Sequence, residues 1–401
     1  MPSAHDVLHG PWRAVPVLGV TQIVAWGAIF YSPVLIVPAI AAERGWSLSF
    51  SMGGFSLCLL VAGFSLPLIG RSIDRFGGHV VMAAGNTVGA LALVGLVHAE
   101  HQLSYLVGWM LLGLGLAGSL YDSAFATLGR IFGAAARTPI TILTLAGGFA
   151  STVGWPSTHF LMGAVGWRGT YLVYSAMLVL VCAPLHALLL PRTKAVVAPP
   201  PDDTAANAPA LLPPHGAAFI LVAAAFASYA FVPSALSAHL LAIFGRTGID
   251  AATVVLIGTL FGPAQVAARL TEFIFARNLH PLTIARFSVV LLVSAFAMLA
   301  VFGISIPTAT AFALMFGAAN GLITIARGAV PLALFGAAGY GALIGRMARP
   351  SMLMQAVAPL ALALVAERTS DPVALACAAA FTIVALVCFA AIRRPRSAIR
   401  R

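Results

Sequence analysis

The chain has 401 residues, of which 61% are hydrophobic and only 8% are charged, and its mean hydropathy is +1.00. A soluble domain carries about 25% charged residues, so this composition excludes a soluble protein and indicates one that crosses a membrane many times. The net charge of +11 then predicts basic loops that orient the protein in the lipid bilayer, and not a nucleic-acid partner.

Motifs for catalysis and metal binding are missing from the sequence. It has no phosphate-binding loop, no Gly-x-Ser-x-Gly turn and no His/Cys spacing typical of a metal site. All four cysteines lie in apolar segments, and none forms a CxxC pair. We therefore predict a protein that is not an enzyme, uses no cofactor or metal, and depends on ion or solute gradients in place of ATP.

Long apolar runs dominate the chain. A helix needs about 20 apolar residues to span the bilayer. By this measure we predict an all-α polytopic membrane protein with twelve transmembrane helices. The predicted segments are 14–40, 48–69, 79–98, 103–129, 138–162, 168–190, 216–243, 251–276, 282–303, 307–327, 346–366 and 372–392.

A proline-rich polar stretch lies at the middle of the chain. Pro199-Pro200-Pro201 and Pro213-Pro214 prevent helix formation there and keep the chain extended. We predict an N-terminal six-helix bundle over 1–190, a linker over 191–215, and a pseudo-symmetric C-terminal six-helix bundle over 216–401. Arginine is concentrated on the side of this linker and of the C-terminal tail, so both termini and the linker are predicted to be cytoplasmic, with the protein in the plasma membrane.

One short charged run separates the second and third apolar segments. It reads Gly70-Arg71-Ser72-Ile73-Asp74-Arg75-Phe76-Gly77-Gly78-His79. Each charge costs roughly 2.5–3.5 kcal/mol in the centre of the hydrocarbon, so we predict a tight turn at the membrane surface.

Within this run, Gly70, Asp74, Arg75 and Gly77 match the signature loop of the major facilitator superfamily, which the sequence resembles. Gly78 and His79 replace the basic pair that is usual in that loop. The resemblance implies a gating role, in which the loop packs against the second half and stabilises the outward-facing state. Asp74 would then face the positive N-terminal end of the eleventh helix, predicted near Arg346. A turn that only fixes topology is the alternative.

A second resemblance covers most of the chain. Gly166-Trp167-Arg168-Gly169-Thr170-Tyr171, Tyr121-Asp122 and Arg269 are similar to stretches of the monocarboxylate and oxalate/formate porters of bacteria. Trp109 stands where drug/proton antiporters carry an arginine in their fourth helix. The resemblance implies a carrier of small carboxylates.

Arg269 is the charged residue that we expect to bind substrate. It lies inside the eighth segment, about 12 Å from the segment's end at a rise of 1.5 Å per residue. A charge at that depth is by default a functional hypothesis, and the planar guanidinium suits a carboxylate. Gln265, one turn earlier, is the expected second donor. The alternative is a structural ion pair between Arg269 and Glu272.

Asp122, inside the fourth segment, is the expected proton carrier, with Glu272 as a second candidate. The alternative for Asp122 is a permanent pair with Arg130 or with another buried arginine. Tyr121 is expected to pack. Four further polar residues could line a central cavity, although each could instead make only a helix–helix hydrogen bond. They are Tyr31, Tyr229, Asn320 and Gln355.

These features together predict a monomeric secondary active transporter that moves a small organic anion, a monocarboxylate, by alternating access with proton coupling. An exporter of drugs, metabolites or toxic compounds, with a wide apolar cavity, is the alternative transport function. A membrane sensor that does not transport is the alternative from another class.

Overall fold

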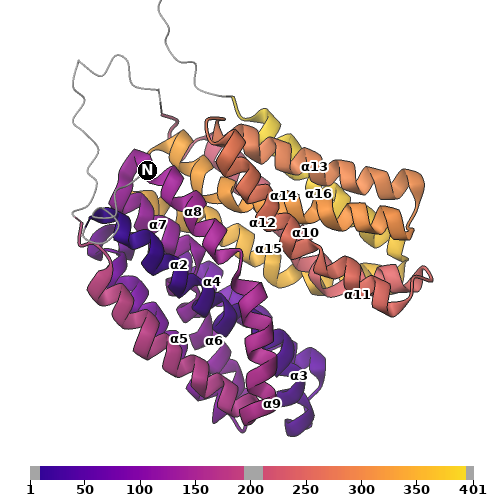
Figure 1. Cartoon of the computed structure of the whole chain (residues 1–401), viewed down its shortest axis with the longest axis horizontal. Coiled ribbons are helices and arrows are strands. Elements are labelled where there is room, and N and C mark those ends of the chain that lie inside the picture. The colour runs from indigo at the N-terminus through magenta and orange to yellow at the C-terminus, as the bar shows by residue number, and fades with distance from the viewer. Residues whose placement is uncertain (1–9, 194–210, 394–401) are drawn as a thin grey trace, which may run out of the picture.

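The computed structural model describes residues 10–193 and 211–393, and these residues form two helical bundles (Figure 1). The predicted linker lies largely outside the described residues, as does most of the basic tail. The N-terminal bundle contains η1 (Pro11–Arg13), α2 (Ala14–Ala25), η2 (Trp26–Tyr31), α3 (Pro33–Arg44), α4 (Leu48–Phe76), α5 (Gly78–Val97), α6 (Gln102–Ser119), α7 (Tyr121–Phe132), η3 (Gly133–Ala136), α8 (Arg137–Gly147), α9 (Ala150–Met177), η4 (Leu178–Cys182) and η5 (Leu185–Leu189). The C-terminal bundle contains α10 (Ala217–Arg246), α11 (Ala251–Thr259), α12 (Phe261–Thr271), η7 (Glu272–Ala276), α13 (Pro281–Phe302), α14 (Ile306–Phe335), α15 (Tyr340–Arg368) and α16 (Asp371–Ala391).

Ten stretches of the described chain are helical and apolar enough to span a membrane, and one of them, Gln102–Leu189, is 88 residues long. A straight helix of that length would extend about 130 Å, against a hydrocarbon core of about 30 Å. Glycines with positive φ divide it, since Gly133 has φ 57° and Gly166 has φ 70°. The long stretch therefore supplies three crossings, and the described chain has the predicted twelve.

Polar caps and prolines set where several helices begin. The Ser47 hydroxyl accepts a hydrogen bond from the Phe50 amide at the start of α4, and the Asp250 carboxylate accepts one from the Thr253 amide at the start of α11. Pro281 occupies the first turn of α13, where its missing N–H costs nothing. These short signals separate the apolar runs into individual helices.

The two bundles meet at the end of the molecule that holds residues 10, 193 and 211, which we call the linker end (Figure 1). One hydrophobic cluster there contains buried side chains of both bundles, among them Phe125, Ile140 and Val330. Helices α4 and α15 pack along each other, and a methyl group on Gly70 would collide with the Gly341 carbonyl. Glycine at both positions therefore allows the two backbones to approach closely.

At the opposite end the bundles diverge, and α9 and α11 lie far apart in Figure 1. The ion pairs at that end hold each bundle to itself. Arg168 of α9 pairs with Glu43 of α3 at 2.6 Å, and Arg246 of α10 pairs with Asp371 of α16 at 2.7 Å. We call this the open end.

Three helices extend past the predicted boundaries. Helix α4 runs to Phe76, so Arg71 to Phe76 are helical, and only Gly77, with φ 89° and ψ 155°, turns the chain. Helix α14 continues to Phe335, and α15 begins at Tyr340, before Arg346. The prediction ended the helices at or near charged residues, and it was wrong there because Arg327 pairs with Asp122 of the other bundle and Asp74 accepts hydrogen bonds from the first turn of α15.

Candidate functional site

Arg269 lies where the two bundles face each other. Its side chain is 4% exposed and donates three hydrogen bonds, all to neutral oxygens. Nε donates to the Gly321 carbonyl of α14 at 3.3 Å, and Nη2 donates to Gln265 Oε1 at 3.1 Å. Nη1 donates to the Thr144 carbonyl of α8, in the other bundle, at 2.7 Å. Arg269 therefore touches both halves of the molecule.

The positive charge of Arg269 is not balanced by a carboxylate. Among the residues that the structure describes, four ion pairs occur, and none includes Arg269. A buried guanidinium without a counter-ion is costly, and its five N–H groups exceed the three hydrogen bonds made here. The arrangement leaves both charge and donor capacity for an anion.

Neutral groups surround this guanidinium. Asn320 Nδ2 donates to the same Gln265 Oε1 that Arg269 contacts, at 3.2 Å. Gly148 follows α8 beside the guanidinium, and a Cβ there would lie 2.8 Å from Arg269 Nη1. Tyr121 is buried close to Arg269, near enough for its hydroxyl to interact with the guanidinium. The structure thus brings three predicted residues together, Arg269, Gln265 and Asn320, and adds Tyr121.

Asp122 makes an ion pair between the bundles. Its Oδ2 lies 2.9 Å from Nη2 of Arg327 on α14, and its Oδ1 has no hydrogen-bond partner. Asp122 is 6% exposed, so both charges depend on each other for solvation. The alternative of a permanent pair with an arginine fits in part, because the partner is the half-buried Arg327 and not Arg130.

Glu272 makes a second ion pair between the bundles. Its Oε1 lies 3.1 Å from Nη2 of Arg137, at the start of α8. The alternative in which Glu272 neutralises Arg269 is therefore wrong. A π-helical turn begins at Glu272 and changes the helical phase after α12. The side chain of Glu272 therefore points in a different direction from that of Arg269.

Asp74 lies at the N-terminal end of α15. Its Oδ1 accepts a hydrogen bond from the Gly341 amide at 2.9 Å, and its Oδ2 accepts one from the Ala342 amide at 2.7 Å. Both amides belong to the first turn of the helix, whose free N–H groups attract an anion. This contact joins α4 of one bundle to α15 of the other.

Arg130 of α7 fixes the end of α4 next to this contact. It donates to the carbonyls of Ile73 and Asp74, and also to the Thr193 carbonyl at 2.8 Å. Arg75 is exposed, and its guanidinium lies 5.0 Å from the centre of the Phe76 ring. Of the four residues with a predicted gating role, Asp74 and Gly70 touch the other bundle, Gly77 turns the chain, and Arg75 lies at the surface.

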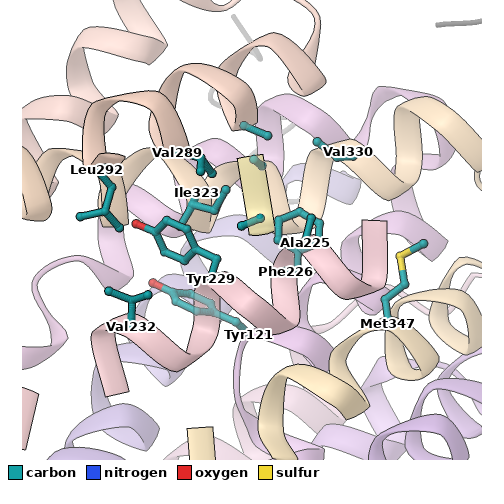
Figure 2. Close-up of a cluster of buried hydrophobic side chains, with 14 of the residues drawn as sticks. Tyr121, Ala225, Phe226, Tyr229, Val232, Val289, Leu292, Ile323, Val330 and Met347 are labelled. Carbon is teal, nitrogen blue, oxygen red and sulfur yellow. The ribbon is translucent and has the colours of Figure 1, made fainter. Parts of the chain in front are cut away.

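Two residues predicted to line a cavity lie elsewhere. The Tyr229 ring packs among Val289, Leu292 and Ile323 inside the C-terminal bundle (Figure 2). The Gln355 amide donates to the Ser351 carbonyl of its own helix at 3.3 Å. Tyr31 lies on η2, within electrostatic range of Arg269.

Sequence reasoning missed three contributors to the site. Arg327 and Arg137 were not among the predicted site residues, and Tyr121 was expected to pack. Asp122 and Arg327 form the signal that could have revealed one pair, since each is a charge inside an apolar run. No pattern in the sequence points to the backbone carbonyls that hold Arg269.

The comparisons with known proteins agree with this architecture. The family model of the Major Facilitator Superfamily matches residues 18–310, well over half of the chain. Human "Monocarboxylate transporter 6" is 30% identical over 195 residues, which cover 45% of this chain and 36% of that protein. The chain therefore matches only about a third of this relative's length.

Solved structures share the fold at low sequence identity. The human organic anion transporter MFSD10 (TETRAN) superimposes with a TM-score of 0.71 at 18% identity, over 94% of this chain and 98% of that one. A bacterial homologue of the iron transporter ferroportin, in an outward-facing state, gives a TM-score of 0.72 at 12% identity, over 94% and 98%. FucP, in the outward conformation, gives 0.66 at 12% identity, over 94% and 97%. The chain belongs to the Major Facilitator Superfamily of membrane transporters.

Proposed function

We propose that this protein is a secondary active transporter of a small organic anion, a monocarboxylate, in which Arg269 binds the carboxylate. The observation that carries the proposal is the buried Arg269 guanidinium, which has hydrogen bonds to neutral oxygens and no carboxylate partner in the described chain. The similarity to "Monocarboxylate transporter 6" supports the same substrate class.

The places where the bundles touch support alternating access. The polar contacts that join the bundles lie toward the linker end, and the ion pairs of the open end lie within single bundles. We propose that the linker end is cytoplasmic and that this state faces outward. Rocking of the two bundles would break the contacts of Asp74, Asp122 and Glu272 and open the site to the other side.

Proton coupling would use the carboxylates that join the bundles. Protonation of Asp122 removes its attraction for Arg327, and protonation of Glu272 does the same for Arg137. A proton would therefore weaken the closed linker end when the anion is bound. We propose Asp122 as the main proton carrier and Glu272 as the second, because each has one carboxylate oxygen without a hydrogen-bond partner that is free to hold a proton.

The test is uptake of labelled monocarboxylates into proteoliposomes under an imposed pH gradient. Arg269→Lys should lower the apparent affinity about 10- to 100-fold, because charged hydrogen bonds contribute about 1.5–3 kcal/mol and lysine lacks the two-pronged geometry. Arg246→Lys, at an exposed ion pair of the open end, is the matched control and should keep the wild-type affinity. Wild-type affinity in Arg269→Lys would refute Arg269 as the anion site.

The exporter of drugs, metabolites or toxic compounds is the second candidate. The apolar composition of the chain is the feature that favours it. Resistance of a sensitive host that expresses the protein, together with no carboxylate uptake, would support the exporter and contradict the anion carrier.

A further inference from the structure

A row of aromatic rings leads away from Arg269 toward the open end. Tyr121, beside Arg269, lies 5.1 Å from Trp26 between ring centres. Trp26 lies 5.9 Å from Tyr31, and Tyr31 lies 5.7 Å from Trp155. The rings come from α7, η2 and α9, so three separate crossings of the N-terminal bundle contribute to one row.

The rings of this row differ in exposure. Tyr121 is buried, Trp26 and Tyr31 are half-buried, and Trp155 is 49% exposed. Trp155 meets Tyr31 edge to face, at 76° between the ring planes, so the broad faces of the two rings are not stacked on each other. A further aromatic ring could therefore pack against them in an offset or edge-to-face arrangement.

Helical periodicity places Trp155 on the face that meets Arg269. Gly148 and Phe149 have helical backbone angles, so α8 and α9 keep one phase. Thr144, Gly148 and Trp155 are separated by four and seven residues, which puts them on one side of this helix. Thr144 and Gly148 lie against Arg269. Trp155 therefore lies on the same side, about 10 Å further along the axis.

The N-terminal bundle also has an apolar groove, on another side of α9. It has a volume of about 300 Å³ and is lined by side chains such as Val24, Phe160 and Met177, and Trp155 is not among them. The aromatic row and this groove are therefore separate surfaces, and residues of the groove provide controls.

We propose that the preferred substrate is a carboxylate with an aromatic body, whose ring packs against Trp26, Tyr31 and Trp155 while Arg269 binds its carboxylate. This inference rests on the proposed function and specifies its substrate class. A two- or three-carbon carboxylate at Arg269 would be too short to cover the exposed parts of the Tyr31 and Trp155 rings. An arylalkanoate would bury their half-exposed rings and gain aromatic packing.

The experiment compares three carboxylates as competitors and as labelled substrates in proteoliposomes: 3-phenylpropionate, 3-cyclohexylpropionate and propionate. Wild type should bind 3-phenylpropionate at least about tenfold more tightly than propionate, a difference of about 1.4 kcal/mol. The cyclohexyl compound has a similar bulk without the aromatic quadrupole, and it should bind more weakly than the phenyl compound.

Variants then locate the preference. Trp155→Leu should reduce the ratio of the affinity for 3-phenylpropionate to the affinity for 3-cyclohexylpropionate to near one. Tyr31→Leu provides a second test if the Trp155→Leu protein does not reach the membrane. Phe160→Leu, also on α9 and 73% exposed, lines the separate groove and should keep the wild-type ratio.

The outcomes distinguish the two levels of the proposal. Propionate uptake that depends on Arg269, without any preference for the phenyl compound, would overturn the aromatic inference and leave the anion carrier intact. The same holds if Trp155→Leu and Tyr31→Leu keep the preference. No binding of any of the three carboxylates would contradict the proposed function and the inference with it.

Discussion

Arg269 and Asp122 solve the problem of an intramembrane charge in different ways. Asp122 has a countercharge, Arg327, at 2.9 Å. Arg269 has neutral oxygens from Gln265, Thr144 and Gly321. The charge of Asp122 is therefore neutralised without a ligand. The charge of Arg269 is surrounded only by neutral dipoles, so Arg269 gains more interaction energy when an anion binds. This difference is why we assign the anion to Arg269 and the proton to Asp122.

At this scale we predict that Asp122→Asn uncouples transport from protons. Asparagine resembles the protonated carboxyl and cannot titrate, so uptake driven by a pH gradient should be lost while exchange of labelled for unlabelled substrate continues. Both activities are measured in the same proteoliposomes.

Asp122→Asn also removes the partner of the half-buried Arg327, and this costs up to about 3–5 kcal/mol, the value for a fully buried pair. The double variant Asp122→Asn with Arg327→Gln separates the two effects. It should recover thermal stability and remain uncoupled. Gradient-driven uptake by the double variant would contradict a proton-carrying role for Asp122.

At the scale of elements, α4 and α15 form the main contact between the bundles. Their approach depends on Gly70 and Gly341, and the Asp74 carboxylate caps the first turn of α15. A helix N-terminus stabilises a carboxylate by about 0.3–1 kcal/mol at exposed sites and up to about 2 kcal/mol when partly buried. One side chain therefore contributes to holding the linker end closed.

We predict that Asp74→Asn loosens this contact. Asparagine offers one acceptor oxygen in place of two and turns an NH₂ group toward the second amide. Hydrogen exchange at Gly341 and Ala342 should accelerate several-fold, up to about 30-fold for a loss of about 2 kcal/mol. Exchange is read by mass spectrometry on peptides that cover 340–346.

The matched control is Asp250→Asn, since Asp250 caps α11 within its own bundle. It should accelerate exchange at the start of α11 and leave 340–346 unchanged. Unchanged exchange at 340–346 in Asp74→Asn would exclude Asp74 as a latch between the bundles.

At the scale of the whole molecule, contacts within and between bundles are distributed unequally. Intrabundle ion pairs tie α3 to α9 and α10 to α16 at the open end, whereas carboxylate pairs at Asp122 and Glu272 join the bundles. Each bundle is thus held together independently of its position relative to the other. We expect rigid rocking, in which the carboxylate pairs are broken and re-formed.

We predict that neutralising both carboxylates shifts the resting state. In the double variant with Asp122→Asn and Glu272→Gln, the distance between spin labels at the exposed positions Phe76 and Ala338 of the linker end should increase. The distance between labels at Leu103 and Thr369 of the open end should decrease. Both distances are measured by pulsed electron paramagnetic resonance. Unchanged distances at both ends would contradict a role for these pairs in closing the linker end.

The twelve crossings were predictable from sequence because hydrocarbon demands long apolar runs. The exact helix ends were not, since the prediction ended one helix just before Arg71 and another at Arg327, and began a third at Arg346. These charges can lie in helices because a distant partner or the protein surface solvates them. Arg327 and Arg346 have their partners, Asp122 and His215, more than 100 residues away in the sequence. The cluster of Arg269 with Gln265 and Asn320 was partly predictable, but its Thr144 and Gly321 carbonyls have no sequence signal.

Arg130 has a mechanical consequence for the connection between the halves. Its guanidinium binds the carbonyls of Ile73 and Asp74 at the end of α4 and the carbonyl of Thr193, where the chain leaves the N-terminal bundle. Tension on the chain at Thr193 would therefore be transmitted through a single side chain to the residue that caps α15.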